Sequence, residues 1–102
     1  MFSSLFFRIS PLVRFIIKEK SMEPNFKEGE NILVTKIFFK LKVGDIIIFR
    51  HTTPPYIFCK RISKISKNKY FVIGDNKKNS IDSRNFGSIS KNDIIGKVIF
   101  KI

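Results

Sequence analysis

Short runs of β-branched and aromatic residues, separated by turn-forming residues, repeat along most of the chain. The runs cover residues 31–35, 45–50, 56–65, 70–73 and 94–101. Turn signals rich in Gly, Pro, Asp and Asn separate them, at residues 28–30, 43–45, 53–55 and 74–76. Runs of this length, bounded in this way, are typical of strands. The sequence therefore predicts a mainly β fold.

The size and charge of the chain restrict what it can be. Its 102 residues make one domain with a modest core. The net charge of +12 favours an anionic partner such as nucleic acid or an anionic membrane surface. A chain rich in Lys, Ile, Asn and Phe and without Ala also fits codon usage biased toward A and T. The charge by itself therefore assigns no partner.

The chain has one cysteine and one histidine, Cys59 and His51. A single cysteine excludes an internal disulfide and a cysteine-based metal site, and a single histidine argues against a histidine-rich one. Cys59 lies inside an apolar run. We therefore interpret it as a buried structural thiol and not as a nucleophile.

Residues 1–17 form a broken apolar segment. Its apolar residues recur at helical spacing, and Arg8 and Arg14 fall on the opposite side, as in a helix lying in a membrane interface. Pro11 argues against one continuous helix. We therefore predict a short helix or anchor that ends near Ser10 and a strand over residues 12–18. The segment is too short and too charged to span a membrane comfortably, and it lacks the cleavage site of a removable signal peptide.

Ser21 and Lys60 are candidates for nucleophilic chemistry. Alternation along the predicted strand 56–65 places Lys60 on one face with Tyr56, Phe58 and Ile62. Burial among apolar side chains disfavours the charged ammonium, and a neutral lysine can take the proton of a serine hydroxyl. Each residue alone has an ordinary explanation, because lysines often extend along apolar surfaces to water and serines often occupy turns.

A polar segment over residues 77–91 follows the strand at 70–73 and has few strand signals. We interpret it as a long ordered loop, which in a compact domain is usually functional. The spacing of Asp82 and Arg84 favours a salt bridge that braces the loop, and Ser80 supplies a hydroxyl that can act near a Ser/Lys dyad. The acidic residues are too few and wrongly spaced for a calcium loop.

Three motifs in order carry a family resemblance. Ser21-Met22-Glu23-Pro24 comes first, Lys60-Arg61-Ile62 follows, and the last is Gly74-Asp75-Asn76 with Ser80-Ile81-Asp82-Ser83-Arg84. Together with the runs at 44–49 and 94–98, they resemble the type I signal peptidase family of serine proteases over about residues 18–100. The last motif is the most specific of the three.

The resemblance implies a fold and roles for individual residues. The fold would be a small β domain of coiled, partly barrel-like antiparallel sheets, with residues 1–17 as an N-terminal apolar segment and residues 18–102 as the catalytic domain. Ser21 would be the nucleophile, Lys60 the general base, and Ser80 would orient the lysine amine. The backbone amide of Ser21 would contribute to the oxyanion hole. Structural roles would fall to Met22, Pro24, Gly74, Asp75, Asn76, Asp82, Ser83 and Arg84.

The resemblance also implies the substrate and the place of action. Substrates would be exported or membrane-tethered precursors, bound in an extended conformation, with small side chains at the first and third positions before the scissile bond. The family needs no metal and no cofactor. The protein would be associated with a membrane, with its active site on the extracytoplasmic face. The oligomeric state does not follow from the sequence.

The chain departs from the family pattern beside the nucleophile. Glu19 stands two positions before Ser21, where the family often has a serine or glycine and where a hydroxyl can aid the oxyanion hole. An ionised carboxylate cannot donate there, and losing one such donor can cost roughly 100- to 1000-fold in rate. Lys20 and Asn25 also differ from the usual residues.

Four alternatives stay open at the level of sequence. A maturation protease of the same family, such as one that trims nickel superoxide dismutase precursors, would fit a short chain with a weak anchor and would be cytoplasmic. Self-cleaving repressor proteases share a Ser-Met element and a strand lysine but lack the motifs at 74–76 and 80–84. A basic β domain that binds nucleic acid would fit the charge, but no known RNA-binding motif is apparent. An inactive relative of the family would explain Glu19 and Lys20.

Overall fold

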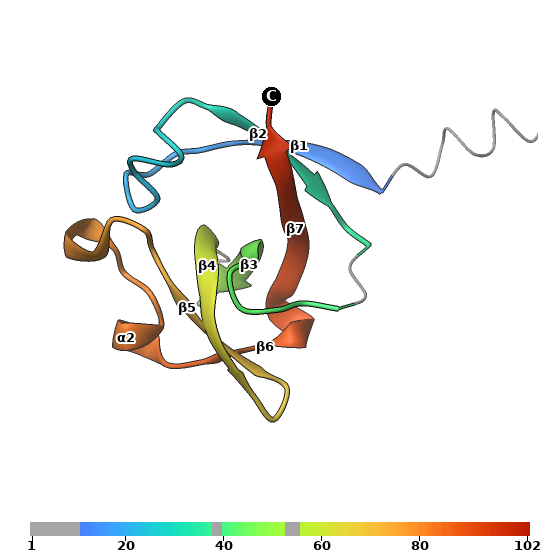
Figure 1. Ribbon diagram of the computed structural model, residues 1–102, viewed down its shortest axis with the longest axis vertical. Coiled ribbons are helices and arrows are strands. Elements are labelled where there is room, and N and C mark those ends of the chain that lie inside the picture. The colour runs from blue at the N-terminus through green and yellow to red at the C-terminus, as the bar shows by residue number, and fades with distance from the viewer. Residues whose placement is uncertain (1–10, 38–39, 53–55) are drawn as a thin grey trace, which may run out of the picture.

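The computed structural model describes residues 11–37, 40–52 and 56–102 of the chain (Figure 1). In these residues seven strands form one antiparallel sheet in the order β1-β2-β7-β3-β4-β5-β6, with β1 and β6 at its two edges. The sheet bends around the middle of the molecule, as Figure 1 shows, but does not close. The strands are β1 (Leu12–Ile16), β2 (Asn31–Thr35), β3 (Ile46–His51), β4 (Tyr56–Ser66), β5 (Lys69–Ile73), β6 (Ile89–Ser90) and β7 (Ile94–Lys101).

The predicted mainly β fold is confirmed, and the predicted strands differ from the observed ones only at their ends. The strand predicted at 45–50 runs from Ile46 to His51, the one at 56–65 extends to Ser66, and the one at 70–73 starts at Lys69. The strand expected over 12–18 ends earlier, at Ile16. The predicted turn at 53–55 and the predicted helix or anchor ending near Ser10 lie outside the described residues.

Part of the N-terminal apolar segment belongs to the sheet. β1 pairs with β2 in antiparallel register from Leu12 opposite Thr35 to Ile16 opposite Asn31. Within the described part of the chain, no helix has the length and hydropathy needed to cross a membrane.

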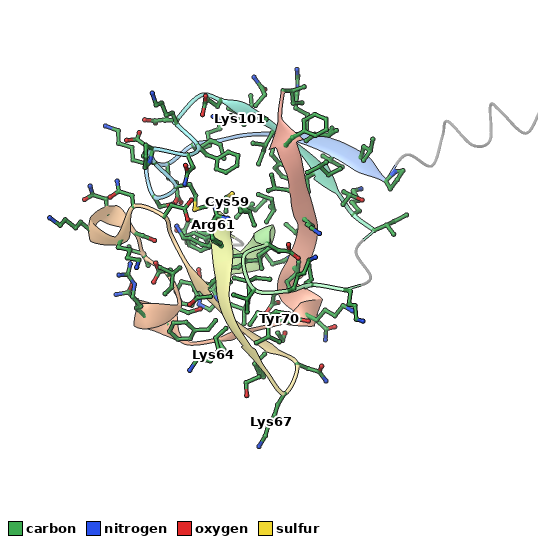
Figure 2. The ribbon with its side chains drawn as sticks, in the orientation of Figure 1. Cys59, Arg61, Lys64, Lys67, Tyr70 and Lys101 are labelled. Carbon is green, nitrogen blue, oxygen red and sulfur yellow. The ribbon has the colours of Figure 1, made fainter. Side chains whose placement is uncertain are left out.

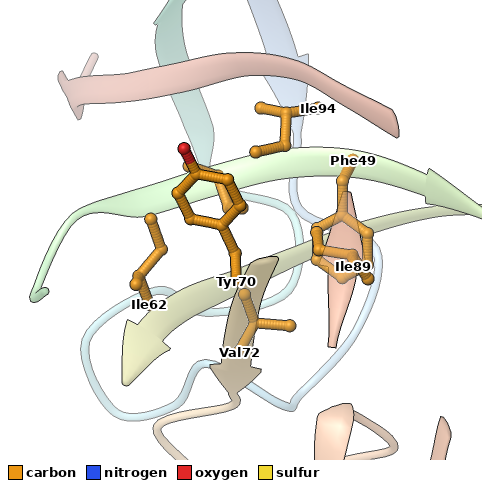
Figure 3. Close-up of a cluster of buried hydrophobic side chains, with 7 residues drawn as sticks. Phe49, Ile62, Tyr70, Val72, Ile89 and Ile94 are labelled. Atoms are coloured by element: carbon orange, nitrogen blue, oxygen red, sulfur yellow. The ribbon is translucent and has the colours of Figure 1, made fainter. Parts of the chain in front are cut away.

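β3 lies in the middle of the sheet and is buried on both faces. Ile47 and Phe49 point into one apolar cluster, shown in Figure 3, together with Ile62, Tyr70, Val72, Ile89 and Ile94. Ile48 points into the other cluster, with Ile17, Ile32, Val34 and Val98. A strand that contacts apolar side chains on both faces needs a continuous apolar sequence instead of an alternating one. This is why residues 46–49 read Ile-Ile-Ile-Phe.

The polar segment 77–91 is more structured than the predicted loop. It contains a 3₁₀ helix η1 (Lys77–Asn79), a short helix α2 (Ser83–Phe86), the edge strand β6 and the start of a second 3₁₀ helix η2 (Lys91–Asp93). The side chain of Asp82 caps α2 by accepting from the backbone of Arg84, and the Asn85 side chain accepts from the backbone of Asp82. These reciprocal contacts form a capping box. Local side-chain hydrogen bonds therefore order a segment that lacks strand-forming residues.

β4 carries both a buried and a solvated side along its eleven residues. Lys60 lies opposite Ile47 of β3 and Phe58 lies opposite Phe49, so both face the first apolar cluster. A register shift between Ile62 and Lys64 then interrupts the alternation. Beyond it, Lys64 and the hairpin residue Lys67 point away from the body of the molecule (Figure 2).

Candidate active site

Lys60 is fully buried within the sheet. Its side chain has an exposed fraction of 0%, and its Nζ lies 5.5 Å from the centre of the Phe58 ring. The sequence placed Lys60 among apolar side chains by strand alternation, and the structure confirms that position. A lysine this deep in a core is unusual, because an ammonium group loses its hydration there.

The amine of Lys60 contacts the hydroxyl of Ser21. Lys60 Nζ and Ser21 Oγ are 2.7 Å apart, and Ser21 is itself buried. Ser21 begins a tight series of turns after the β1 segment, in which Phe26 donates its amide hydrogen to the Met22 carbonyl oxygen. The two residues are 39 positions apart in the chain. The structure thus brings together the two residues that the sequence singled out as a dyad.

The Gly-Asp-Asn turn holds the serine segment in place. The amide of Asn76 donates to the carbonyl oxygen of Ser21 at 2.7 Å, and the Asn76 side chain donates to the carbonyl oxygen of Lys20 at 3.2 Å. The amide of Asp75 approaches the Met22 sulfur at 3.4 Å. A Cβ atom added at Gly74 would lie 2.7 Å from the Ser21 carbonyl oxygen and closer still to Ser80 Oγ. Only glycine lets this turn approach the serine so closely.

Asp75 ties the same turn to the strand that carries the lysine. Arg61, the neighbour of Lys60, donates from Nε and Nη2 to the two carboxylate oxygens of Asp75, at 2.9 and 2.8 Å. Asn25 donates to the same carboxylate at 2.8 Å. The hydrogen bonds from Arg61 lower the pKa of Asp75. A bidentate pair fixes direction as well as distance, so it sets the turn, and with it Ser21, relative to β4.

Asp82 is the hub of the loop behind the site. Its carboxylate is fully buried and accepts five hydrogen bonds, from Gly74 N, from Ser80 Oγ, and from the backbone N, Nε and Nη2 of Arg84. Burial by itself would raise the pKa of Asp82, but the hydrogen bonds from Arg84, Ser80 and Gly74 outweigh it and hold the pKa far below its usual range. The ion pair that the spacing of Asp82 and Arg84 predicted is therefore present.

Glu19 completes a triangle with the serine and the lysine. Its Oε1 accepts a hydrogen bond from Ser21 Oγ at 3.0 Å and one from Lys60 Nζ at 3.2 Å. The sequence marked Glu19 as a departure from the expected pattern but did not indicate that it would contact both residues. The carboxylate is more accessible than the amine, with an exposed side-chain fraction of 44%.

Two hollows flank the triangle. The first has a volume of about 230 Å³ and lies between β1 and β4; its lining includes Ser21, Met22, Phe15, Ile57 and Cys59. The second is formed with the loop at 78–81 and also borders Glu19 and Phe58. Burial raises the pKa of the Cys59 thiol to about 12, so this cysteine is protonated at neutral pH and is a poor nucleophile.

No three His, Cys, Asp or Glu side chains gather closely enough to hold a metal ion in the described ranges 11–37, 40–52 and 56–102.

The chain matches a protein-family model along its whole length. The family model described as signal peptidase, peptidase S26 matches residues 1–63 and 58–102. The chain belongs to the signal peptidase family. Signal peptidase I of Buchnera aphidicola subsp. Baizongia pistaciae is 35% identical to it over an alignment of 81 positions that covers 74% of this chain and 24% of that protein. The chain thus spans about a quarter of the length of this relative.

The alignment with a second signal peptidase covers a larger share of that protein. Signal peptidase IB of Staphylococcus aureus is 26% identical over an alignment of 145 positions, covering 85% of this chain and 75% of that protein. Because the alignment is longer than the 102 residues of the chain, the staphylococcal protein has extra segments within the matched region.

The signal peptidase motifs converge on one place in the structure. Ser21 and Met22 contact the Gly74–Asn76 turn, and Ser80, Asp82 and Arg84 lie directly behind that turn. Ser80 donates its hydrogen bond to Asp82 Oδ2 at 2.7 Å, and its role in orienting the Lys60 amine stays a prediction. Ser83 is buried and accepts from the amide of Val72 at 2.8 Å. Pro24 lies in the turns after Ser21.

Sequence reasoning missed two of the contacts made by charged residues. It did not pair Arg61 with Asp75, and it did not connect Glu19 with Lys60. Both pairs are distant in the chain, so no local spacing reveals them. Two signals for these pairs were available in the sequence. Asp75 is the acidic residue of the Gly-Asp-Asn turn, and Glu19 is an acidic residue between two lysines.

Proposed function

We propose that this member of the signal peptidase family is a serine endopeptidase that removes signal or leader peptides from precursor proteins with a Ser21/Lys60 dyad. One observation carries the proposal. The amine of a fully buried lysine lies 2.7 Å from a serine oxygen at the border of an apolar hollow. A buried amine that contacts a hydroxyl is placed to act as its general base.

In the proposed reaction, Lys60 acts as a neutral amine. It takes the proton of Ser21 Oγ while the oxygen attacks the scissile carbonyl carbon and forms a tetrahedral intermediate. The backbone amide of Ser21 donates to the oxyanion. The intermediate collapses when the lysine ammonium returns the proton to the leaving nitrogen, which leaves an acyl ester on Ser21. Water then gives a proton to Lys60 and attacks the ester carbonyl carbon. The bond from this carbon to Ser21 Oγ breaks, which releases the peptide with a free carboxyl group, and the lysine ammonium returns the proton to Ser21 Oγ.

The two strands beside the first hollow favour an extended substrate. β1 is an edge strand, and β4 pairs with β5 only from Arg61 onward, which leaves the opposite edge of residues 56–60 without a strand partner among the described residues. Phe15 and Ile57 line the hollow from these two strands. An extended peptide can add main-chain hydrogen bonds at such edges while its side chains fill the apolar hollow.

The proposed place of action is a membrane surface, with the site on the extracytoplasmic side. Leu12 and Ile16 of β1 and the C-terminal residues Phe100 and Ile102 are exposed large apolar residues, and the chain carries a net charge of +12. Apolar side chains among cationic ones favour contact with an anionic membrane surface.

Cleavage of a preprotein by purified variants tests the dyad. Ser21→Ala and Lys60→Met should each lower kcat/KM by about 10,000-fold, because each removes a group that the proposed reaction requires. Ser63→Ala and Lys64→Met are matched controls, since both residues are exposed on the same strand as Lys60. They should retain full activity. A rate near that of the wild type in Ser21→Ala or Lys60→Met, with the fold intact by circular dichroism, would rule out the proposed mechanism.

A further inference from the structure

Glu19 is the carboxylate that contacts Lys60, and it contacts Ser21 with the same oxygen. Oε1 accepts from Lys60 Nζ at 3.2 Å and from Ser21 Oγ at 3.0 Å. The only ion pair of Lys60 in the described part of the chain is the one with Glu19. The serine hydroxyl therefore donates to the carboxylate of Glu19 and accepts from the amine of Lys60.

The burial of the pair is unequal, and this decides what the carboxylate does. The Lys60 side chain is fully buried, while that of Glu19 has an exposed fraction of 44%. A buried ammonium is costly without a countercharge, and a nearby carboxylate favours the charged form. An ionised Glu19 thus stabilises Lys60 as an ammonium, the form that cannot take a proton from Ser21.

The same carboxylate acts directly on the serine. A negative group 3.0 Å from Ser21 Oγ opposes the negative charge that develops on and near this oxygen during attack on a carbonyl. Both effects of the ionised carboxylate therefore work against the reaction.

We propose that Glu19 is a built-in counter-ion that holds the Ser21/Lys60 dyad in a resting, charged state, so that loss or displacement of its charge releases the dyad for catalysis. This rests on the proposed function. Glu19 borders both hollows beside the dyad, where a bound peptide would meet its half-exposed side chain. Glu19 is therefore a positioning residue that acts through Lys60 and Ser21.

Several other charged or titratable groups lie near Glu19. Cys59 precedes Lys60 on β4, and the negative charge of Glu19 adds to burial in raising the pKa of the Cys59 thiol. Lys78 borders the second hollow with Glu19, and Lys18 and Lys20 flank it in the chain. A lysine side chain carries no negative charge, so none of these three can replace Glu19 as the countercharge of Lys60.

The test is the pH profile of kcat/KM for cleavage of a preprotein by the full chain and by Glu19→Gln. Glu28→Gln is the matched control, because it removes the same charge from an exposed turn. The acidic limb of the profile, where kcat/KM rises with pH, should lie about one pH unit lower in Glu19→Gln, since an opposite charge at this distance shifts a titration by one unit or more. At a pH below the midpoints of both limbs, kcat/KM of the variant should then be about tenfold higher than that of the wild type. An unchanged limb, or an equal loss of rate at every pH, would overturn the inference.

A second readout does not depend on cleavage. The Lys60 side-chain ¹³Cε signal can be followed against pH in lysine-labelled protein and assigned by its absence in Lys60→Met. The Lys60 amine should lose its proton at a lower pH in Glu19→Gln than in the wild type and in Glu28→Gln. Equal titration in all three proteins would overturn the inference even if cleavage is observed. A clear difference without any cleavage would uphold the ion pair and contradict the proposed function.

Discussion

Two ion pairs among the described residues have one fully buried partner, and they are built in opposite ways. In the Asp82–Arg84 pair the anion is buried and the cation has an exposed fraction of 36%. In the Glu19–Lys60 pair the cation is buried and the anion is the accessible partner. The Asp82 carboxylate accepts five hydrogen bonds, whereas Lys60 Nζ has Ser21 and Glu19 as its hydrogen-bond partners.

This difference separates a pair that braces a loop from a pair that includes the proposed general base. Arg84 does not lose its proton in a protein, and the bonds to Asp82 fix the loop that positions Gly74 and Ser80. A lysine amine, unlike a guanidinium, can act as a base, and in the proposed reaction Lys60 takes the proton of Ser21. Burial alone does not distinguish the two pairs. The two pairs differ in the number of hydrogen-bond partners that the buried group has and in the chemistry of the cation.

Asp82→Asn should have the largest effect on stability. The substitution leaves Arg84 and the amide of Gly74 with a neutral partner, and we expect a loss of about 2–3 kcal/mol in the free energy of unfolding. Lys60→Met replaces a buried amine with an apolar chain of similar length, so its free energy of unfolding should stay within about 1 kcal/mol of the wild type or rise. Urea denaturation of the two variants measures both values. A greater loss for Lys60→Met than for Asp82→Asn would reverse the comparison.

Gly74→Ala should have an intermediate effect on stability and a strong one on activity. The added methyl group would meet the Ser21 carbonyl oxygen and Ser80 Oγ, and overpacking of this kind costs about 1–3 kcal/mol. Gly96→Ala is the control, because its Cβ would lie 2.6 Å from the Thr35 carbonyl oxygen between β2 and β7, away from the dyad. Both variants should lose similar stability, but only Gly74→Ala should lower kcat. Equal losses of kcat would mean that the turn does not position Ser21.

The pH dependence of stability should show the smallest effect. Asp82 and Asp75 have pKa values below their ordinary ones in the folded protein. Their contribution to stability is therefore full above the unfolded pKa of about 3.9, and it is lost as the pH falls through the lower folded values. The urea midpoint should drop between pH 5 and pH 2.5 in the wild type and drop less in Asp82→Asn. Parallel curves for the two proteins would show that Asp82 does not carry this dependence.

The sequence predicted the features that depend on local pattern. β-branched runs located the long strands, alternation along residues 56–62 placed Lys60 in the core, and the spacing of Asp82 and Arg84 indicated their pair. The short helix α2 was missed because a capping box formed by the side chains of Asp82 and Asn85 stabilises it, which no run of apolar residues indicates. The link between Arg61 and Asp75 depends on how β4 and the turn at 74–76 meet in space, which no local pattern encodes.

Glu19 shows where a family pattern stops being informative. The comparison with that pattern marked the position as unusual, but it predicted only the absence of a donor. The contact of the carboxylate with both Ser21 and Lys60 arises because the chain after β1 turns back against β4, 41 residues away in sequence. A substitution in a motif can therefore add an interaction as well as remove one.

Trapping the acyl-enzyme tests the Ser21/Lys60 dyad most directly. The full chain would be mixed with a p-nitrophenyl ester of a peptide with small residues before the ester, quenched in acid, digested and mapped by mass spectrometry. The acyl group should be found on Ser21 in the wild type, and the yield on Ser21 should fall at least about 100-fold in Lys60→Met, while Lys64→Met should match the wild type. Acylation of Ser21 that is as fast without Lys60, or no acylation of Ser21 in a chain that cleaves preproteins, would contradict the dyad.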